Sequence, residues 1–189
     1  MNVRLMQNNE VSLIKKLADE SFGKDYITTN DILSYLNSTH KFAFCLFDNQ
    51  GFIGFLFLKT YSNDTIQNYF LTQKEWFTNY FKSTKEIAVV TQIALTKEHR
   101  LLGLSKLLFN SSIDFIKPKC NTIISICWVK EEMNNMKFLL LNNGFKTIKT
   151  LQNYWLQDSI EKGYCCEICG TPPCQCNAEV FELKSPSVN

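Results

Sequence analysis

Residues 87–116 read IAVVTQIALTKEHRLLGLSKLLFNSSIDFI, and this stretch decides the fold that the sequence predicts. Its opening residues are nearly all apolar and several are β-branched, which is typical of a central strand covered on both faces. After Gly103, apolar residues recur on one helix face, at Leu104, Leu107, Leu108, Phe115 and Ile116. The stretch therefore predicts a buried strand, a turn that contains glycine, and an amphipathic helix.

The turn between this strand and this helix has the chemistry of a phosphate site. Gly103 lets the backbone approach a ligand closely, and the N–H groups of the first helical turn have no intrahelical partner. The positive end of the helix dipole adds to their attraction for an anion, and Arg100 supplies a fixed charge. An ordinary connection with an incidental arginine is the simpler interpretation, but the position between a buried strand and a helix favours a phosphate site.

The spacing Arg100-x-x-Gly103-x-Ser105 resembles the coenzyme A motif of the GNAT acyltransferase superfamily, usually written Arg/Gln-x-x-Gly-x-Gly/Ala. A second segment, FLLLNNGF at residues 138–145, is similar to the family's fourth helix, which ends in a Gly-Phe pair. By the order of elements, the resemblance covers about residues 3–154. It implies a GNAT-like α/β fold.

The resemblance also implies a function and a set of binding residues. The function is transfer of an acetyl group from acetyl-CoA, the cosubstrate, to an amine of a small molecule or a peptide. Backbone groups at the end of the strand would bind the pantetheine arm, and N–H groups of the turn would bind the pyrophosphate. The residues implied are Ile93, Ala94, Leu95, Arg100, Leu101, Leu102, Gly103, Leu104 and Ser105.

One departure from the family pattern concerns the proton that must reach the coenzyme A thiolate. Many members place a tyrosine five residues before the Phe of the Gly-Phe pair, where this chain has Leu140. Tyr154 is our candidate for the missing acid, and a packed aromatic beside Trp155 is the alternative interpretation. A catalytically weak coenzyme A-binding protein, or a zinc-dependent interaction protein, is therefore the alternative function.

Other candidate groups are less well defined by the sequence. Gln92 is a polar residue inside the apolar strand, where it would either hold a water for base catalysis or satisfy a bulged backbone. His99 precedes the motif in a loop and is expected to point to solvent. The asparagine at the start of the family's fourth helix corresponds to either Asn134 or Asn135.

A second strong pattern, CCEICGTPPCQC at residues 165–176, predicts a metal site. Four thiolates at about 2.3 Å form a closed structural zinc site, and the same ligands also suit iron. Cys165 could replace Cys166, but the x-x spacing followed by Gly170 is the commoner geometry. Free or disulfide-bonded cysteines are the simpler alternative. The expected ligands are Cys166, Cys169, Cys174 and Cys176.

Bulk properties limit the class of protein. The 189 residues, 45% hydrophobic and 20% charged, are typical of one globular domain, which we expect over residues 1–189 with a cysteine-rich metal-binding insertion at 163–177. A net charge of +2 without a long basic run gives no indication of nucleic-acid binding. The absence of a signal core or an 18-residue apolar run predicts no membrane segment and a cytoplasmic location. The partner expected is an amine acceptor, and a homodimer is possible.

The order of predicted elements indicates a mixed, mostly antiparallel central sheet of about seven strands flanked by helices. Strands are expected at 3–7, 40–47, 52–59, 87–95, 121–129, 145–151 and 178–183. Helices are expected at 10–22, 31–36, 73–81, 104–116 and 133–142. Thr29 or Asn30 would cap the second helix. The aromatic face of the third helix would close one end of the core or, in the alternative interpretation, line an acceptor pocket.

Overall fold

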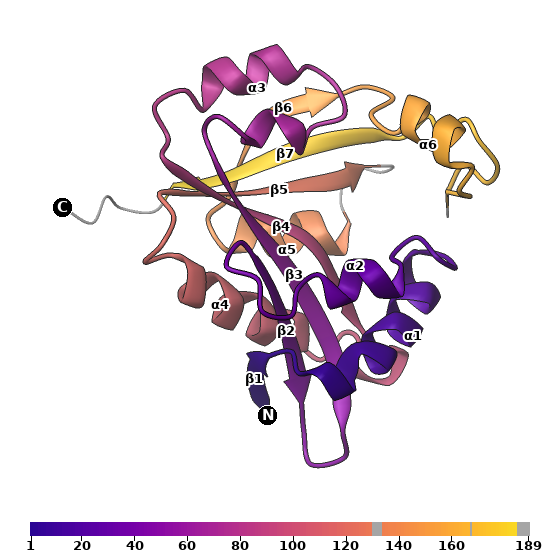
Figure 1. Cartoon of the computed structure of the whole chain (residues 1–189). Coiled ribbons are helices and arrows are strands. Elements are labelled where there is room, and N and C mark those ends of the chain that lie inside the picture. Colours follow the sequence, from indigo (N-terminus) through magenta and orange to yellow (C-terminus); the bar gives the residue numbers. More distant parts are fainter. Residues whose placement is uncertain (130–133, 167, 185–189) are drawn as a thin grey trace. The chain divides into compact units, whose positions relative to one another are not determined.

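The computed structural model describes residues 1–129, 134–166 and 168–184 (Figure 1). A 7-stranded mixed sheet has the order β1-β2-β3-β4-β5-β7-β6, and helices flank it. The strands are β1 (Asn2–Leu5), β2 (Lys41–Phe47), β3 (Phe52–Ser62), β4 (Glu86–Leu95), β5 (Thr122–Val129), β6 (Lys146–Leu151) and β7 (Asn177–Lys184). The helices are α1 (Val11–Phe22), α2 (Thr29–Leu33), α3 (Lys74–Tyr80), α4 (Leu104–Ile116), α5 (Asn135–Asn142) and α6 (Leu156–Lys162). The predicted fold class is confirmed.

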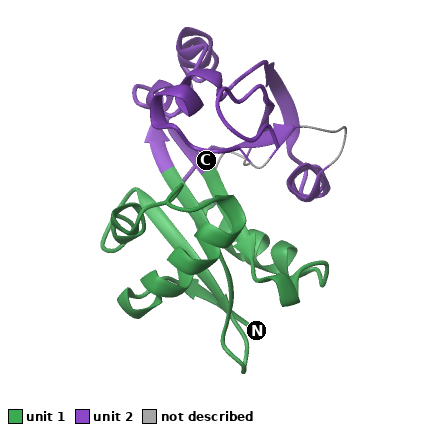
Figure 2. Cartoon of the chain, turned by 90° about the vertical axis from the view of Figure 1, so that its right-hand side faces the viewer, with its two compact units in different colours: residues 1–59, 90–116 green, residues 60–89, 117–189 purple. Residues whose placement is uncertain are grey.

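The chain divides into two compact units (Figure 2). Each unit has its own core of buried apolar residues. Unit 1 contains residues 1–59 and 90–116, and unit 2 contains residues 60–89 and 117–189. Strands β3 and β4 contribute residues to both units. The expectation of one domain with a metal-binding insertion stays a prediction.

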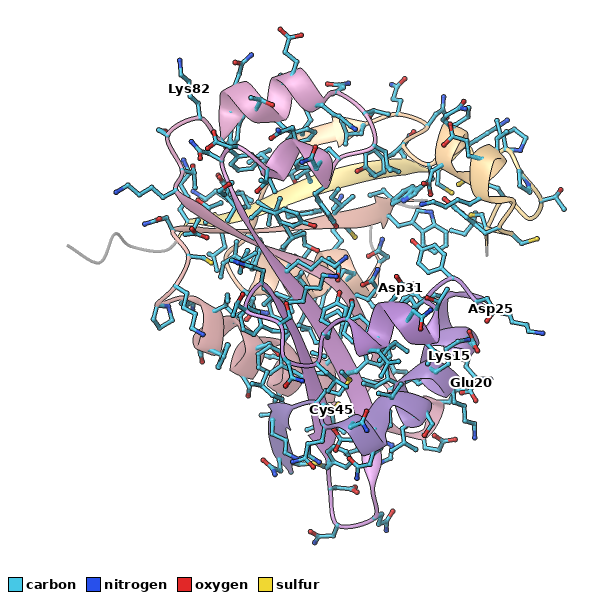
Figure 3. All side chains as sticks on the ribbon, viewed as in Figure 1. Lys15, Glu20, Asp25, Asp31, Cys45 and Lys82 are labelled. Atoms are coloured by element: carbon cyan, nitrogen blue, oxygen red, sulfur yellow. The ribbon has the colours of Figure 1, made fainter. Side chains whose placement is uncertain are left out.

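In unit 1, the two faces of β2 contact different helices. Ala43 and Cys45, the latter labelled in Figure 3, belong to a core that also contains buried residues of α1 and α2. Phe42 and Phe44 instead contact the ring of Phe115 in α4, with centroid distances of 5.5 and 5.3 Å. Because successive strand residues point to opposite faces, α1 and α2 cover one face of β2 and α4 covers the other.

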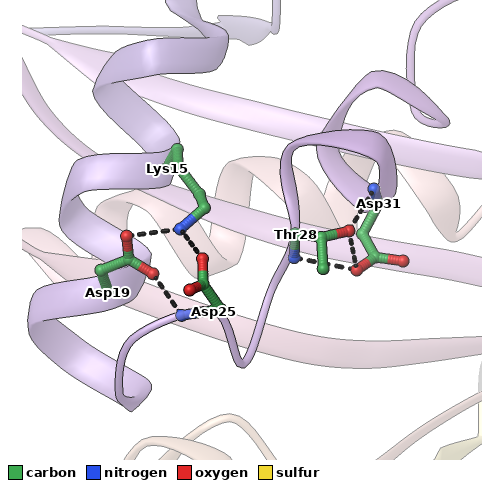
Figure 4. A network of polar contacts seen from close by, with 5 residues as sticks. All are labelled: Lys15, Asp19, Asp25, Thr28 and Asp31. Carbon is green, nitrogen blue, oxygen red and sulfur yellow. Dashed lines mark hydrogen bonds and ion pairs between the residues drawn. The ribbon is translucent and has the colours of Figure 1, made fainter.

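Helix α2 begins earlier than the sequence led us to expect. Its N-cap is Thr28, whose Oγ1 accepts the N–H of Asp31 at 3.1 Å while the Asp31 carboxylate accepts the N–H of Thr28 at 2.9 Å (Figure 4). The prediction of Thr29 or Asn30 as the cap was wrong. A capping box needs an acidic or amide side chain three positions after the cap, and of these three residues only Thr28 has one.

The connection from α1 to α2 is held by charged side chains. Lys15 Nζ contacts the carboxylate of Asp19 and lies 3.0 Å from that of Asp25 (Figure 4). Asp19 in turn accepts the N–H of Asp25 at 2.9 Å, which fixes Asp25 at a φ of 60°. The hydrogen bond from Lys15 is the main cause that lowers the pKa of Asp19. These contacts order the turn that leads into α2.

In unit 2, strand β7 pairs antiparallel with both β5 and β6 over an aromatic core. Phe77 of α3 and Phe81, which follows it, are fully buried in that core, whereas Tyr80 is 38% exposed. The burial of Phe77 and Phe81 supports the interpretation that the aromatic face of α3 closes the core.

Several element bounds differ from the prediction. Helix α6 was missed because the region between β6 and β7 was interpreted only as a metal-binding hairpin, and the short polar helix gives a weak periodic signal. Strand β1 ends at Leu5 because Gln7 caps a 3-10 turn. Helix α5 begins at Asn135, and the predicted start at Met133 lies outside the described residues. None of the helices in the described part of the chain combines the length and apolar character that a membrane span requires.

Candidate functional site

The turn from β4 to α4 has an unusual backbone. Leu101 and Gly103 have φ values of 63° and 77°, in the left-handed region, and α4 begins at the next residue, Leu104. This region costs a residue with a Cβ about 1–2 kcal/mol. The side chain of Leu101 is 93% exposed, so its own packing does not offset that cost. Residues in such a costly conformation are often found at functional sites.

Arg100 is tied to the strand that precedes the turn. Its Nε donates to the carbonyl oxygen of Leu95, the last residue of β4, at 3.1 Å. Arg100 is extended, with φ −76° and ψ 156°, so the chain reverses direction only after it. The guanidinium is therefore held at the turn that joins β4 to α4, where its positive charge adds to that of the helix N-terminus.

His99 is anchored, and the expectation that it points to solvent was wrong. Its Nδ1 lies 2.8 Å from Thr96 Oγ1, and its Nε2 lies 3.8 Å from the carboxylate of Asp48. The 3-10 turn at Lys97–His99 brings the ring back over Thr96. The backbone N–H of Gln50 donates to the Asp48 carboxylate and is the main cause that lowers the pKa of Asp48. The loop before the motif is thereby joined to the β2–β3 hairpin.

Gly54 of β3 is a site residue that the sequence reasoning missed. A Cβ at this position would lie 2.4 Å from the carbonyl oxygen of Ala94 and 2.5 Å from Leu95 Cδ2. The Thr96 N–H donates to the Ile53 carbonyl at 2.8 Å, beside this close approach. A lone glycine inside an apolar strand is the sequence signal for such an approach. Glycine therefore allows β3 to contact the end of β4.

The other candidates on β4 differ in exposure. Ala94 and Leu95 are each 7% exposed, whereas Gln92 and Ile93 are half-buried. The neighbouring Thr91 donates through Oγ1 to the Phe57 carbonyl at 3.3 Å. The proposed base role of Gln92 stays a prediction.

Tyr154, the candidate acid, is 4% exposed in the core of unit 2. Its hydroxyl oxygen accepts the N–H of Leu71 at 3.1 Å, and its ring packs edge-on against Trp155 at 4.9 Å. These contacts support the packing interpretation, while the catalytic role stays a prediction. Leu140, which replaces the family's tyrosine, is fully buried in α5. Asn134 is the N-cap of α5 and accepts the Lys137 N–H at 2.8 Å.

The predicted metal ligands are brought together. The sulfurs of Cys166, Cys169, Cys174 and Cys176 all lie within 4.8 Å of one another, and Cys165 is exposed outside this group. Sγ–Sγ distances are 3.7 Å for Cys166–Cys176 and 3.3 Å for Cys169–Cys176. A tetrahedron with about 2.3 Å metal–sulfur bonds has edges of about 3.8 Å, so these thiols fit zinc or iron. All eight cysteines lie in the described part of the chain, and each is free of a disulfide.

Backbone N–H groups surround the sulfurs of this cluster. The N–H groups of Ile168 and Cys169 donate to Cys166 Sγ, and that of Gln175 donates to Cys169 Sγ, each at 3.4 Å. The Gln175 donor is the main cause that lowers the pKa of the Cys169 thiol. Gly170, with a φ of 77°, exchanges two backbone hydrogen bonds with Cys166. Such donors stabilise thiolates and orient them as metal ligands.

Two further contacts fix the cluster within unit 2. The N–H of Cys174 donates at 2.8 Å to the hydroxyl of Ser159, a fully buried residue of α6. The N–H of Tyr154 donates to the Cys176 carbonyl at 3.1 Å. Ser159 of α6 and Tyr154, which follows β6, therefore both hold the cysteine loop in place.

No protein-family model and no curated protein matches the chain. Solved structures do match over nearly its whole length. Arabidopsis thaliana NAA60 in complex with a bisubstrate analogue has a TM-score of 0.70 at 12% identity, covering 97% of each chain. The ribosomal-protein-S18-alanine N-acetyltransferase from Escherichia coli has a TM-score of 0.68 at 12% identity, covering 100% of this chain and 96% of its own. A variant of spermidine N-acetyltransferase SpeG from Vibrio cholerae has a TM-score of 0.65 at 16% identity, covering 98% and 95%. The chain thus has the GNAT fold.

Proposed function

We propose that this chain transfers an acetyl group from acetyl-CoA to an amine of a small molecule or a peptide. The observation that carries the proposal is the left-handed turn between β4 and α4. Leu101 adopts a costly backbone conformation while its side chain remains in solvent. Packing of that side chain does not explain the conformation, which supports a ligand-binding role for the backbone of the turn. Together with the motif residues Arg100, Gly103 and Ser105, this geometry supports a pyrophosphate site.

The binding roles follow from the elements that meet at this turn. N–H groups from Leu101 to Ser105 bind the pyrophosphate, and Arg100, held by the Leu95 carbonyl, provides the fixed positive charge. Backbone groups of residues 93–95 pair with the pantetheine arm. The glycine at position 54 supports this role, because it allows β3 to lie against the Ala94 carbonyl without a side chain in between.

The reaction requires few catalytic groups. The amine nitrogen attacks the thioester carbonyl carbon, the carbon–sulfur bond breaks, the amine loses a proton and the thiolate gains one. Tyr154 is our proposed donor of that proton, and Gln92 our proposed holder of a water that accepts the amine proton. Structural neighbours whose names specify a ribosomal-protein alanine or spermidine as acceptor support an amine, without selecting one class.

We also propose that the four clustered thiols bind one structural zinc ion, with iron as the alternative. The sulfur separations and the N–H donors support this assignment. Four protein ligands leave no open coordination position, so the metal would stabilise the fold of the loop without acting on the substrate.

Calorimetric titration with acetyl-CoA tests the coenzyme site. Gly103→Val should abolish binding, because the added side chain occupies the space that a pyrophosphate needs; apart from its two chain neighbours, no described residue has an atom within 4 Å of the new Cβ. Gly163→Val is the matched control, since Gly163 also has a left-handed φ, of 67°, with open space around it. Unchanged affinity in a folded Gly103→Val protein would contradict the site. Binding without acetyl transfer to any amine would instead favour the catalytically weak alternative.

A further inference from the structure

Two lysines face each other on one side of the sheet in unit 1. Lys41 and Lys59 are direct register partners in the antiparallel pair β2–β3, so their side chains lie on the same face. Like charges directly opposite each other destabilise a sheet. Neither lysine forms an ion pair with any residue in the described ranges. The repulsion between the two lysines therefore lowers the stability of the free protein, so stability does not explain why both positions are lysine.

Both ammonium groups converge on one aromatic ring. Lys41 Nζ and Lys59 Nζ each lie 5.9 Å from the centroid of the Tyr35 ring. That ring is 8% exposed and stacks on Phe57 at 4.3 Å, so its position is fixed by the core. Lys41 also donates to Ser34 Oγ at 3.0 Å. The two charges are thus held in place at the end of a rigid platform, while both lysines remain only half-buried.

One acidic group, Asp31, offsets only part of the charge of this pair. Asp31 interacts with both lysines through space, but its carboxylate accepts hydrogen bonds from Thr28, which are the main cause of its lowered pKa. Burial, followed by the charge of Lys41, lowers the pKa of Lys59. With Asp31 counted, the local excess is one positive charge, which matches a single carboxylate better than a doubly charged phosphate.

We propose that Lys41 and Lys59 form a binding site for the carboxylate group of a ligand, with the Tyr35 ring as its floor. Each ammonium donates to one carboxylate oxygen, in charge-assisted hydrogen bonds of about 2.7–2.9 Å. Binding removes the repulsion between the two lysines, so the cost of placing them together in the free protein is recovered when the site is filled.

The position of the site also identifies a class of acceptor, an inference that rests on the proposed acetyl transfer. Thr91 of β4 contacts the Phe57 carbonyl, and Lys59 is two residues further along β3. At about 3.4 Å per residue, with neighbouring strands about 4.8 Å apart, the backbones of the two lysines lie roughly 8–12 Å from that of Thr91. The acceptor is then an amine that carries a carboxylate at about this distance, as in an acidic peptide.

Titration with acetate, followed by NMR of the lysine side chains, tests the site without any coenzyme. Acetate should saturably shift the Lys59 Nζ and Cε signals, whereas chloride at equal ionic strength should not. Lys41→Met keeps the aliphatic stem and should weaken acetate binding at least tenfold. Lys82→Met, at an exposed position, is the matched control (Figure 3). Melting temperatures confirm that each variant is folded.

Three outcomes would overturn the carboxylate site. One is a Lys59 response to acetate no larger than that of Lys82. Another is acetate binding that survives Lys41→Met, and the third is saturation by inorganic phosphate but not by acetate.

Kinetics with matched peptide acceptors test the acceptor class. Lys59→Met should raise KM at least tenfold for a peptide with an acidic side chain and leave kcat and the KM of its amide analogue nearly unchanged. An equal effect on both peptides would overturn this class. If the wild-type protein acetylates no amine, the proposed function fails, and the acetate titration still decides the site by itself.

Discussion

The turn before α4 and the cysteine cluster before β7 are both short loops. The backbone defines the first, and side chains define the second. At the turn, the backbone is the structured part, while the side chains of Leu101 and Leu102 are 93% and 65% exposed. In the cluster, the side chains converge, and backbone N–H groups serve the sulfurs. The turn should therefore be sensitive to backbone conformation and tolerant of side-chain changes, and the cluster should show the opposite behaviour.

The largest effect should come from removing one thiol of the cluster. Purified protein should contain one zinc or iron ion per chain by elemental analysis, and Cys169→Ser should lose it. Structural zinc contributes about 10–16 kcal/mol in zinc-finger peptides, so the loss should also lower the melting temperature markedly. Cys165→Ser changes an exposed thiol outside the cluster and should keep the metal. A metal-free preparation that melts at the same temperature, and that stays metal-free after zinc is added, would exclude the site.

An intermediate effect is expected from Tyr154→Phe, which removes the hydroxyl oxygen that accepts the Leu71 N–H. As the proton donor, Tyr154 should account for about 10²-fold in kcat, with little change in KM for acetyl-CoA. The change also removes the acceptor of the Leu71 N–H, but Leu71 is 40% exposed and water can replace that acceptor, so the unfolding free energy should fall by only about 0.5–1.5 kcal/mol. Steady-state kinetics and urea denaturation separate the two roles. A stability loss with nearly native kcat would assign Tyr154 to packing alone.

The smallest effect, and the sharpest test of the turn, is Leu101→Gly. Glycine adopts a φ of 63° without the cost that a Cβ imposes. The unfolding free energy of the variant should therefore equal that of the wild type or exceed it by up to about 1 kcal/mol. Its affinity for acetyl-CoA should stay within about threefold, since the backbone supplies the binding groups. Leu102→Ala is the control for side-chain loss alone. A tenfold loss of affinity in Leu101→Gly would show that the side chain takes part in binding.

The sequence predicted those features that depend on local pattern. The strand, turn and helix of residues 87–116 and the grouping of four thiols each follow from a spacing that the fold preserves, while metal binding by those thiols stays a prediction. Gly54 inside an apolar strand signals a close backbone approach, but the residues that it approaches could not be predicted, because they depend on which strand lies beside β3. The pairing of Lys41 with Lys59 depends likewise on the register between β2 and β3. Neither property is present in any one segment of the chain.

Helix α6 and the hydroxyl of Ser159 also could not be predicted from a single segment of the sequence. A seven-residue polar helix has too few turns to give a periodic signal, and its stability comes from packing within unit 2. Ser159 gains its role only when the N–H of Cys174 reaches it. Contacts between segments distant in sequence, rather than unusual residues, thus account for what sequence reasoning missed.

The division into units has a consequence for any attempt to study them as fragments. The chain enters unit 2 at residue 60, returns to unit 1 at residue 90 and leaves it again after residue 116. No single proteolytic cut or truncation therefore releases either unit as a continuous polypeptide. A fragment that ends at residue 116 would contain all of unit 1 but would also expose the apolar half of β4, including Ile87 and Val89, which are fully buried in the intact chain. Such a fragment should aggregate through that half-strand, so the two units have to be probed in the intact chain.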